Sequence, residues 1–202
     1  MPLLNTQPHK VKQEDKRRRF LIWSYIFDFV KLVVLALVFV WLIHRFVFQP
    51  FVVFGPSMEP NFHDGDYLII ERVSYYLHNP ERGDAVILAA PQEQNGFLIK
   101  RVIGLPNERI VIKRGHVYIF NQDHPQGIRL SEDYLPSGLT TPGQIDYSLK
   151  DDEYFLLGDN RSISLDSRSF GPVSREDIVG RPLWRPLPLK ALGPIKKLNY
   201  GF

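Results

Sequence analysis

The residues best suited to carry chemistry begin with a serine in an unusual turn. Ser57 lies in the stretch 54–60, beside a glycine and between two prolines. Proline fixes φ and glycine permits unusual backbone angles, so this turn is stiff and can approach a ligand closely. Because the turn follows the apolar run 51–54, Ser57 is expected at a strand end, presented as a nucleophile. A plain Pro-Gly turn with an incidental serine is the alternative that this stretch alone leaves open.

A serine nucleophile needs a base, and Lys100 has the setting that this role requires. In the expected strand 97–103, alternation places Lys100 on the face of Leu98 and Val102 and points Arg101 the opposite way. An apolar setting disfavours the ammonium and lowers the lysine pKa from about 10.4, as a general base requires. The alternative is a strand-edge lysine that extends its ammonium to water.

Histidine is the usual partner of a serine nucleophile, and His63 is the best rival base. It lies six residues after Ser57 and adjoins the turn 64–66. The other histidines after the apolar segment lie in turns or at strand edges and are expected at the surface: His78, His116 and His124. The acidic residues of 64–66 lack the full spacing of a metal loop. No metal or cofactor is therefore expected.

A third candidate part of the site is a polar cluster, residues 158–171. It combines Asp, Arg and several hydroxyl residues, directly after the expected strand 153–157. A solvated loop is enough to explain the polarity of this cluster. It does not explain why the same chain also offers an exposed serine and a lysine in an apolar strand.

An apolar segment, residues 20–48, precedes all of these residues. Its part 29–48 supplies the roughly 20 apolar residues that span a bilayer, and 32–43 contains neither charge nor an amphipathic pattern. We expect a membrane anchor rather than a buried helix of a soluble domain. A cleaved signal peptide is disfavoured because no small residues follow the apolar core at 44–50.

The positive charge of the chain is concentrated before this anchor. Residues 1–19 hold six Lys or Arg against two acidic residues, whereas the rest holds 19 basic and 20 acidic residues. The nearly neutral remainder argues against a DNA-binding face. The positive-inside rule predicts a cytoplasmic N-terminus. We therefore expect a flexible cytoplasmic tail (1–19), an anchor in the cell membrane (20–48) and an extracytoplasmic catalytic domain (49–202).

The remainder of the chain predicts a mainly β fold without strong helical patterns. Eight apolar runs, separated by turn residues at spacings typical of a sandwich or barrel, are candidate strands: 51–54, 67–72, 84–88, 97–103, 109–113, 116–121, 153–157 and 178–184. Residues 122–152 are rich in Gly, Pro, Ser and Asp and predict long loops with one short strand pair at most. The chain has no cysteine, which excludes a disulfide framework, a thiol nucleophile and a thiolate zinc site.

In their order along the chain, these features resemble the bacterial type I signal peptidases, membrane-bound leader peptidases of the S26 family with a serine/lysine dyad. The likeness is carried by the anchor and by three motifs: residues 55–60 with Gly65 and Asp66, residues 100–106, and residues 158–168. The resemblance implies a signal-peptidase-type β-rich catalytic domain behind a single transmembrane helix. It also implies that Ser57 is the nucleophile, that Lys100 is the base, and that the Ser57 N–H contributes to the oxyanion hole.

The resemblance assigns supporting roles to the third motif. Ser164 would orient the lysine amine, and Asp166 and Arg168 would form an ion pair beneath the site. Gly158 and Asp159 belong to the same motif and are included among the supporting residues.

The resemblance also implies a substrate. Exported preproteins would bind in extended form and be cut after small residues at the first and third positions before the bond. Val53 and Ile99 match family positions that line the two shallow pockets. The expected partners are preproteins and membrane lipid, without nucleic acid. Gly55 departs from the members that carry an oxyanion-binding serine there, and Asn107 replaces a turn glycine, which Asn tolerates because it visits αL.

Two other functions stay open at this point. A self-cleaving, repressor-like Ser/Lys protease would carry a DNA-binding domain where this chain has its apolar segment. A membrane-tethered binding protein with an inactive dyad is the alternative outside enzymes. Cleavage of a preprotein by the purified protein separates these functions.

Overall fold

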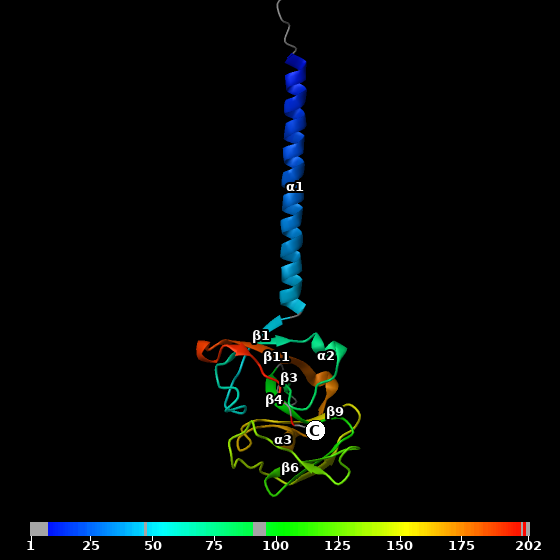
Figure 1. The fold of residues 1–202 in the computed structure, drawn as a ribbon, viewed down its shortest axis with the longest axis vertical. Helices are drawn as coiled ribbons and strands as arrows, with labels where there is room; N and C mark the ends of the chain where they lie inside the picture. The colour runs from blue at the N-terminus through cyan, green and yellow to red at the C-terminus, as the bar shows by residue number, and fades with distance from the viewer. Residues whose placement is uncertain (1–7, 47, 91–95, 199, 201–202) are drawn as a thin grey trace, which may run out of the picture. The chain divides into compact units, whose positions relative to one another are not determined.

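The chain consists of two compact units, Met1–Phe46 and Val47–Phe202. The computed structural model describes residues 8–46, 48–90, 96–198 and 200, although not the side chains of 8–17, 20, 42–46 and 48. Figure 1 shows the helix of the first unit and the β-rich body of the second.

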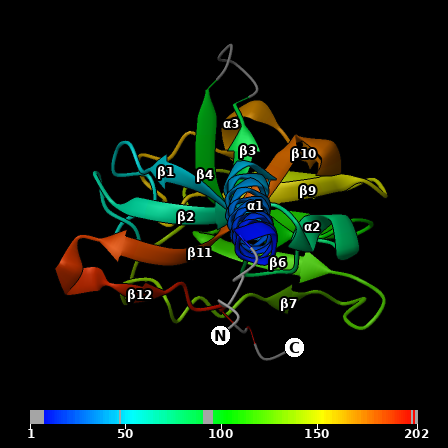
Figure 2. The same cartoon turned by 90° about the horizontal axis from the view of Figure 1, so that it is seen from above.

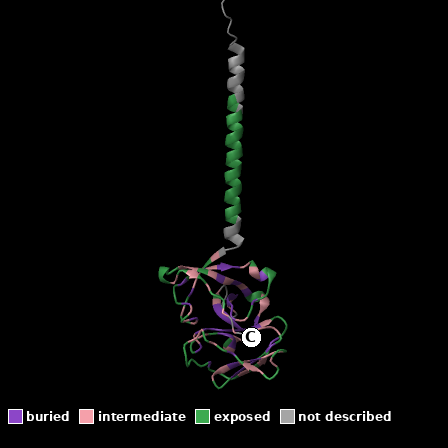
Figure 3. Ribbon diagram, in the orientation of Figure 1, coloured by how far each residue is buried: buried purple, intermediate pink, exposed green. Residues whose placement is uncertain are grey.

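The first unit contains one long helix, α1 (Pro8–Phe46). Its stretch Leu21–Trp41 has 21 residues and a mean hydropathy of 2.1, which gives about 30 Å of helix, the thickness of a bilayer core. Every residue of this stretch is exposed and is coloured green in Figure 3. A helix of this length and composition can cross a membrane.

The helix begins earlier than the sequence indicated. Residues 8–19 were expected to belong to a flexible tail, and this expectation is wrong because α1 starts at Pro8. Each residue added to an existing helix gains one hydrogen bond, and Lys, Arg, Gln and Glu are good helix formers. The helix of the apolar segment therefore continues into the basic segment that precedes it. Residues 1–7 lie outside the described residues.

The second unit is mainly β and contains two antiparallel sheets (Figure 2). The larger sheet has eight strands in the order β1-β2-β11-β3-β4-β9-β10, with β12 paired to β11. Its strands are β1 (Phe48–Val52), β2 (Tyr67–Glu71), β3 (Ala85–Ala89), β4 (Phe97–Gly104), β9 (Glu153–Leu157), β10 (Val173–Ser174), β11 (Ile178–Leu187) and β12 (Gly193–Pro194). This order places β4 inside the sheet, between β3 and β9.

The smaller sheet has the order β7-β6-β5-β8. Its strands are β5 (Arg109–Lys113), β6 (His116–Phe120), β7 (Ile128–Arg129) and β8 (Ile145–Ser148). The two short strands of the loop-rich segment 122–152 do not pair with each other: β7 pairs with β6, and β8 pairs with β5. Each satisfies the free backbone groups at one edge of the β5–β6 hairpin.

The elements seen in the structure differ from the sequence expectation in further details, among them two short strands that were not expected, β10 and β12. The first strand lies at 48–52 rather than 51–54, and Pro50 is tolerated in it because β1 ends the order of the larger sheet. Two short helices, α2 (Ser74–Leu77) and α3 (Ser167–Phe170), and two 3-10 turns, η1 (Arg175–Asp177) and η2 (Leu189–Ala191), interrupt the β structure. Four residues are too few to produce a helical pattern in a sequence.

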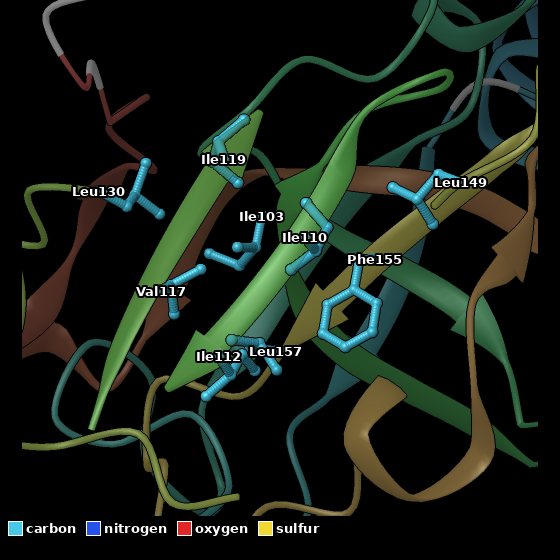
Figure 4. Packing of buried hydrophobic residues seen from close by; sticks show 9 residues of the cluster. All are labelled: Ile103, Ile110, Ile112, Val117, Ile119, Leu130, Leu149, Phe155 and Leu157. Atoms are coloured by element: carbon cyan, nitrogen blue, oxygen red, sulfur yellow. The ribbon is translucent and has the colours of Figure 1, made fainter. Parts of the chain in front are cut away.

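Most buried apolar side chains among the described residues of the second unit fall into three clusters. Nine residues of the smaller sheet, of β4 and β9, and of the adjoining segments pack together (Figure 4): Ile103, Ile110, Ile112, Val117, Ile119, Leu130, Leu149, Phe155 and Leu157. On β3, Ala85 and Ile87 face the second cluster, whereas Val86 and Leu88 face the third. The central strands are therefore buried on both faces, which gives the site a rigid support.

Candidate active site

Ser57 lies in the loop between β1 and β2. Met58 and Phe62 anchor this loop from beneath, with 0% and 2% of their surface exposed. The carbonyl oxygen of Ser57 accepts a hydrogen bond from the Asn160 N–H at 3.0 Å. Gly55 adopts a φ of +77°, which favours glycine. Ser57 thus sits on a fixed turn, five residues beyond the end of β1 rather than directly at a strand end.

Lys100 lies in the middle of β4 and its side chain reaches Ser57. The residue is 2% exposed, and its Nζ donates to the Ser57 Oγ at 3.0 Å and to the Ile99 carbonyl oxygen at 2.9 Å. Leu98 and Val102, its neighbours by alternation, belong to one apolar cluster. The apolar face expected for Lys100 is therefore present, and the lysine is not a solvated edge residue.

The surroundings of Lys100 favour the neutral amine. Burial lowers the pKa of Lys100 to about 8, although the charges of Asp166 and Asp159 act in the opposite direction. The free-energy cost of removing the ammonium from water is larger than the stabilisation that the two carboxylates give it. An amine with this pKa is partly neutral near neutral pH and can accept a proton.

Arg101, the next residue of β4, is also buried, with 3% of its surface exposed. Its Nε and Nη2 donate to the two carboxylate oxygens of Asp159 at 2.7 and 2.5 Å. Asp159 also accepts a hydrogen bond from the Asn61 side chain at 2.9 Å, and Arg101 lies over the Tyr134 ring. The pair therefore ties β4 to the loop that carries Ser57.

Asp166 and Arg168 form a second ion pair. Nε and Nη2 of Arg168 donate to the Asp166 carboxylate at 2.8 and 2.7 Å, and Asp166 is fully buried. Asp166 also accepts the Gly158 N–H at 3.0 Å and caps α3 through the Arg168 N–H. The carboxylate thus fixes the backbone of the segment that follows β9.

Gly158 marks the place where the Ser57 and Ser164 segments meet. A Cβ at position 158 would overlap the Ser164 side chain and lie 2.5 Å from the Ser57 carbonyl oxygen. The Ser164 Oγ is buried and has no hydrogen-bond partner among the described residues. The hydrogen bonds of Lys100 Nζ go to Ser57 and Ile99, so a bond from Ser164 to the amine is not part of this structure.

A cleft of about 590 Å³ opens beside the two residues. Ser57, Lys100 and Ile99 contribute to its lining, together with Phe54 and Phe97, which are 82% and 53% exposed. Val53, expected to line a substrate pocket, is instead 1% exposed and packs in the apolar cluster below the loop. Its neighbours Val52 and Phe54 line the cleft in its place.

Arg161 is a buried site residue whose partners the sequence did not indicate. It is 1% exposed, and it bonds to the Gly158 carbonyl at 3.0 Å and to the Thr141 hydroxyl at 2.5 Å. Glu132 and the Tyr134 hydroxyl complete its surroundings. These partners come from the segment 122–152, where sequence patterns show only loops. Arg161 therefore fastens that segment to the third motif.

His63 does not contact the nucleophile. It is exposed, and its backbone N–H donates to Asp66 at 3.0 Å. Among the described residues the His63 imidazole makes no hydrogen bond, and no group of three or more His, Asp or Glu could hold a metal ion. The structure therefore brings a lysine, rather than a histidine, to Ser57.

A serine hydroxyl bonded to a buried lysine lies at a cleft in this β-rich unit, and a hydroxyl with an adjacent basic group is the usual setting of an activated serine nucleophile. The family model described as "Signal peptidase, peptidase S26" matches residues 26–185. The chain therefore belongs to the S26 family of signal peptidases, which are serine peptidases. The resemblance to bacterial type I signal peptidases that the motifs indicated is confirmed.

Two Bacillus relatives agree with this assignment, and one solved structure is similar to part of the chain. Signal peptidase I P of Bacillus subtilis subsp. natto is 32% identical over 177 residues, which cover 83% of this chain and 90% of that protein. Signal peptidase I of Bacillus amyloliquefaciens is 34% identical over 167 residues, 78% of this chain and 85% of that protein. A solved signal peptidase I from Enterococcus faecalis V583 is 28% identical, with a TM-score of 0.43 over 52% of this chain and 97% of that chain.

Proposed function

We propose that this chain is a membrane-anchored endopeptidase that removes signal peptides from exported preproteins with a Ser57/Lys100 dyad. The observation that carries the proposal is the 3.0 Å contact between the buried Lys100 Nζ and the Ser57 Oγ at an open cleft. The family assignment supplies the reaction, and the relatives named above are signal peptidases I.

The reaction follows from the dyad. The neutral Lys100 amine takes the Ser57 hydroxyl proton while Oγ attacks the scissile carbonyl carbon. The resulting ammonium then gives this proton to the leaving amine, and the C–N bond breaks to leave an ester on Ser57. Lys100, neutral again, takes a proton from the water that attacks the ester carbonyl. The C–O bond to Ser57 then breaks, the Lys100 ammonium returns the proton to the Ser57 Oγ, and the product acid leaves and ionises in solvent. The Ser57 N–H contributes to stabilising the oxyanion.

An extended peptide fits the cleft as an added strand. In the described part of the chain β1 pairs only with β2, and β4 pairs with β9 only from Arg101 onward. Residues 50–52 of β1 and 97–100 of β4 both contribute to the cleft lining, so they can bind backbone groups of a peptide between them. Ile99 at the cleft floor limits the room for side chains, in keeping with small residues before the bond.

Membrane anchoring rests on α1 and on the basic residues at its start. We infer that residues 1–19 lie in the cytoplasm, that the apolar segment within 20–48 spans the bilayer, and that 49–202 is the extracytoplasmic catalytic domain. The exposed Phe54 and Phe97 beside the cleft suit contact with lipid. The proposed partners are preproteins and lipid, without nucleic acid.

The test uses the full chain in lipid vesicles with a purified preprotein. Mass spectrometry should show one cut after a small residue, and a bulky residue in that position of the substrate should prevent it. Ser57→Ala should abolish cleavage. Reporter fusions after residue 15 should be cytoplasmic, and those after residue 60 extracytoplasmic. An active Ser57→Ala protein, or the opposite topology, would disprove the proposal.

A further inference from the structure

The buried amine of Lys100 has two buried carboxylates for neighbours. Asp159 and Asp166 are both fully buried, and both act electrostatically on the Lys100 amine. Negative charge beside an amine stabilises its protonated form. A base that must lose its proton near neutral pH would therefore be hindered by two uncompensated carboxylates.

The two carboxylates are built in the same way. Each receives Nε and Nη2 of its own arginine, Arg101 for Asp159 and Arg168 for Asp166, at distances of 2.5 to 2.8 Å. The arginine side chains are themselves largely buried, with 4% and 11% exposed. A guanidinium keeps its charge at any pH in which a protein functions. Each carboxylate is thus permanently paired, and the field of a pair falls with distance faster than that of a single charge.

We propose that Arg101 and Arg168 act through this pairing to free the base: they stop Asp159 and Asp166 from holding a proton on Lys100. They are positioning residues that set the pH range in which the lysine is neutral. The inference rests on the proposed function of Lys100 as the base, and it adds to that function the groups that determine its working pH.

The carboxylates cannot simply be absent, because each has a second task. Asp159 accepts the Asn61 side chain and so holds the Ser57 loop, and Asp166 accepts the Gly158 N–H and caps α3. Both hydrogen bonds need acceptors at these places. The arginines reduce the electrostatic side effect of the acceptors. The carboxylates still oppose deprotonation of Lys100, and the burial of the amine outweighs them and lowers its pKa to about 8.

Most other charged groups on the elements around the amine are paired or lie at the exposed surface. Glu59 of the Ser57 loop is half-buried and has no ion-pair partner among the described residues, but the carboxylates that act on the amine are Asp159 and Asp166. On the Ser57 loop, Asp66 is paired with Arg185, and His63 and Asp64 are exposed. Strand β3 carries no charge, and Glu153 of β9 is paired with Lys150. Arg161 is paired with Glu132. The Asp159 and Asp166 pairs are therefore the ones to vary.

The experiment separates charge from shape at Arg168, the less buried of the two arginines. Full-chain protein in micelles is labelled with ¹³C at the lysine Cε, and the Lys100 signal is identified by its loss in Lys100→Arg. Arg168→Gln should raise the titration midpoint of the amine by about one pH unit, which lowers the neutral fraction about tenfold below the midpoint. Arg168→Lys keeps the charge and should leave the midpoint near that of the wild type.

Two further variants test the direction in which each charge shifts the titration midpoint of the Lys100 amine. Asp166→Asn keeps an oxygen acceptor for Gly158 but removes the negative charge, so the midpoint should fall. The double variant Asp166→Asn/Arg168→Gln should return it toward the wild-type value. Arg109→Gln, in the exposed Arg109–Asp146 pair of the smaller sheet, is the matched control and should change nothing.

The outcomes are distinct. An unchanged midpoint in Arg168→Gln, or an equal shift in Arg168→Lys and Arg168→Gln, overturns the inference in favour of a structural role. Should Arg168→Gln not fold, an unchanged midpoint in Asp166→Asn overturns it equally. If the amine midpoints move as expected but the pH dependence of cleavage does not follow them, the inference stands and the assignment of Lys100 as base fails.

Discussion

The Lys100 Nζ lies 3.0 Å from the Ser57 Oγ, although the two residues are 43 positions apart and come from a strand and a separate loop. If this contact transfers the proton, only the neutral amine is active. Cleavage should then rise with pH through a midpoint near 8, the pKa to which burial lowers this lysine. The pH dependence of kcat/KM measures that midpoint.

Substitutions at Lys100 and His63 check the same assignment. Lys100→Arg keeps the positive charge but cannot deprotonate, so the rate should fall on the order of 10²- to 10⁴-fold. His63→Ala should keep nearly full activity because the imidazole is exposed and away from Ser57. An active Lys100→Arg protein with a midpoint near pH 6.5 would instead identify a histidine base.

Ser164→Ala should lower turnover while leaving the fold intact. The Ser164 Oγ is buried and unpartnered among the described residues, and a hydroxyl in such a place is available to orient the lysine amine during the reaction. Loss of orientation should reduce kcat on the order of 10²-fold. The control is Ser162→Ala, whose hydroxyl is exposed and bonds to Asn160. Equal rates in both variants would remove the orienting role.

Gly158→Ala should lower both activity and thermal stability. The added methyl group would overlap Ser164 and press on the Ser57 carbonyl oxygen, 2.5 Å away, in a fully buried place. Overpacking of this kind costs about 1 to 3 kcal/mol. Adding Ser164→Ala should not restore the melting temperature because the contact with the Ser57 carbonyl oxygen remains. A Gly158→Ala protein with wild-type melting temperature and rate would contradict the close approach.

Asp159→Ala should unfold the catalytic unit at a much lower temperature. It leaves Arg101, whose side chain is 4% exposed, without its carboxylate, and breaking a buried pair from one side costs about 3 to 5 kcal/mol. Asp146→Ala removes one partner of the exposed pair with Arg109 and should leave the melting temperature unchanged. Melting curves in the same detergent compare them, and similar melting temperatures would contradict a role for burial.

The sequence predicted the parts of this protein that depend on local patterns. The strands 109–113 and 153–157 match their expected bounds, and alternation placed Lys100 on its apolar face. The partners of Arg161 could not be predicted, because Glu132 and Thr141 come from a segment without periodicity and reach the arginine only through the tertiary fold. The expectation for Val53 came from the family resemblance rather than from alternation. The chain leaves β1 at Val52, so strand geometry does not determine which side chain faces the cleft at that point.

Strand β4 presents Lys100 and Arg101 to opposite buried faces, so the activity of a folded molecule depends on the register of this strand. A slip of one residue in the pairing of β4 that brings the Arg101 guanidinium to Ser57 would turn the Lys100 side chain to the opposite face, at the position of Ile99. Such a molecule could be compact and still catalytically inactive, since arginine cannot act as the base. Titration of a preparation with a reagent that acylates Ser57 would therefore count correctly registered molecules, which protein concentration or circular dichroism does not.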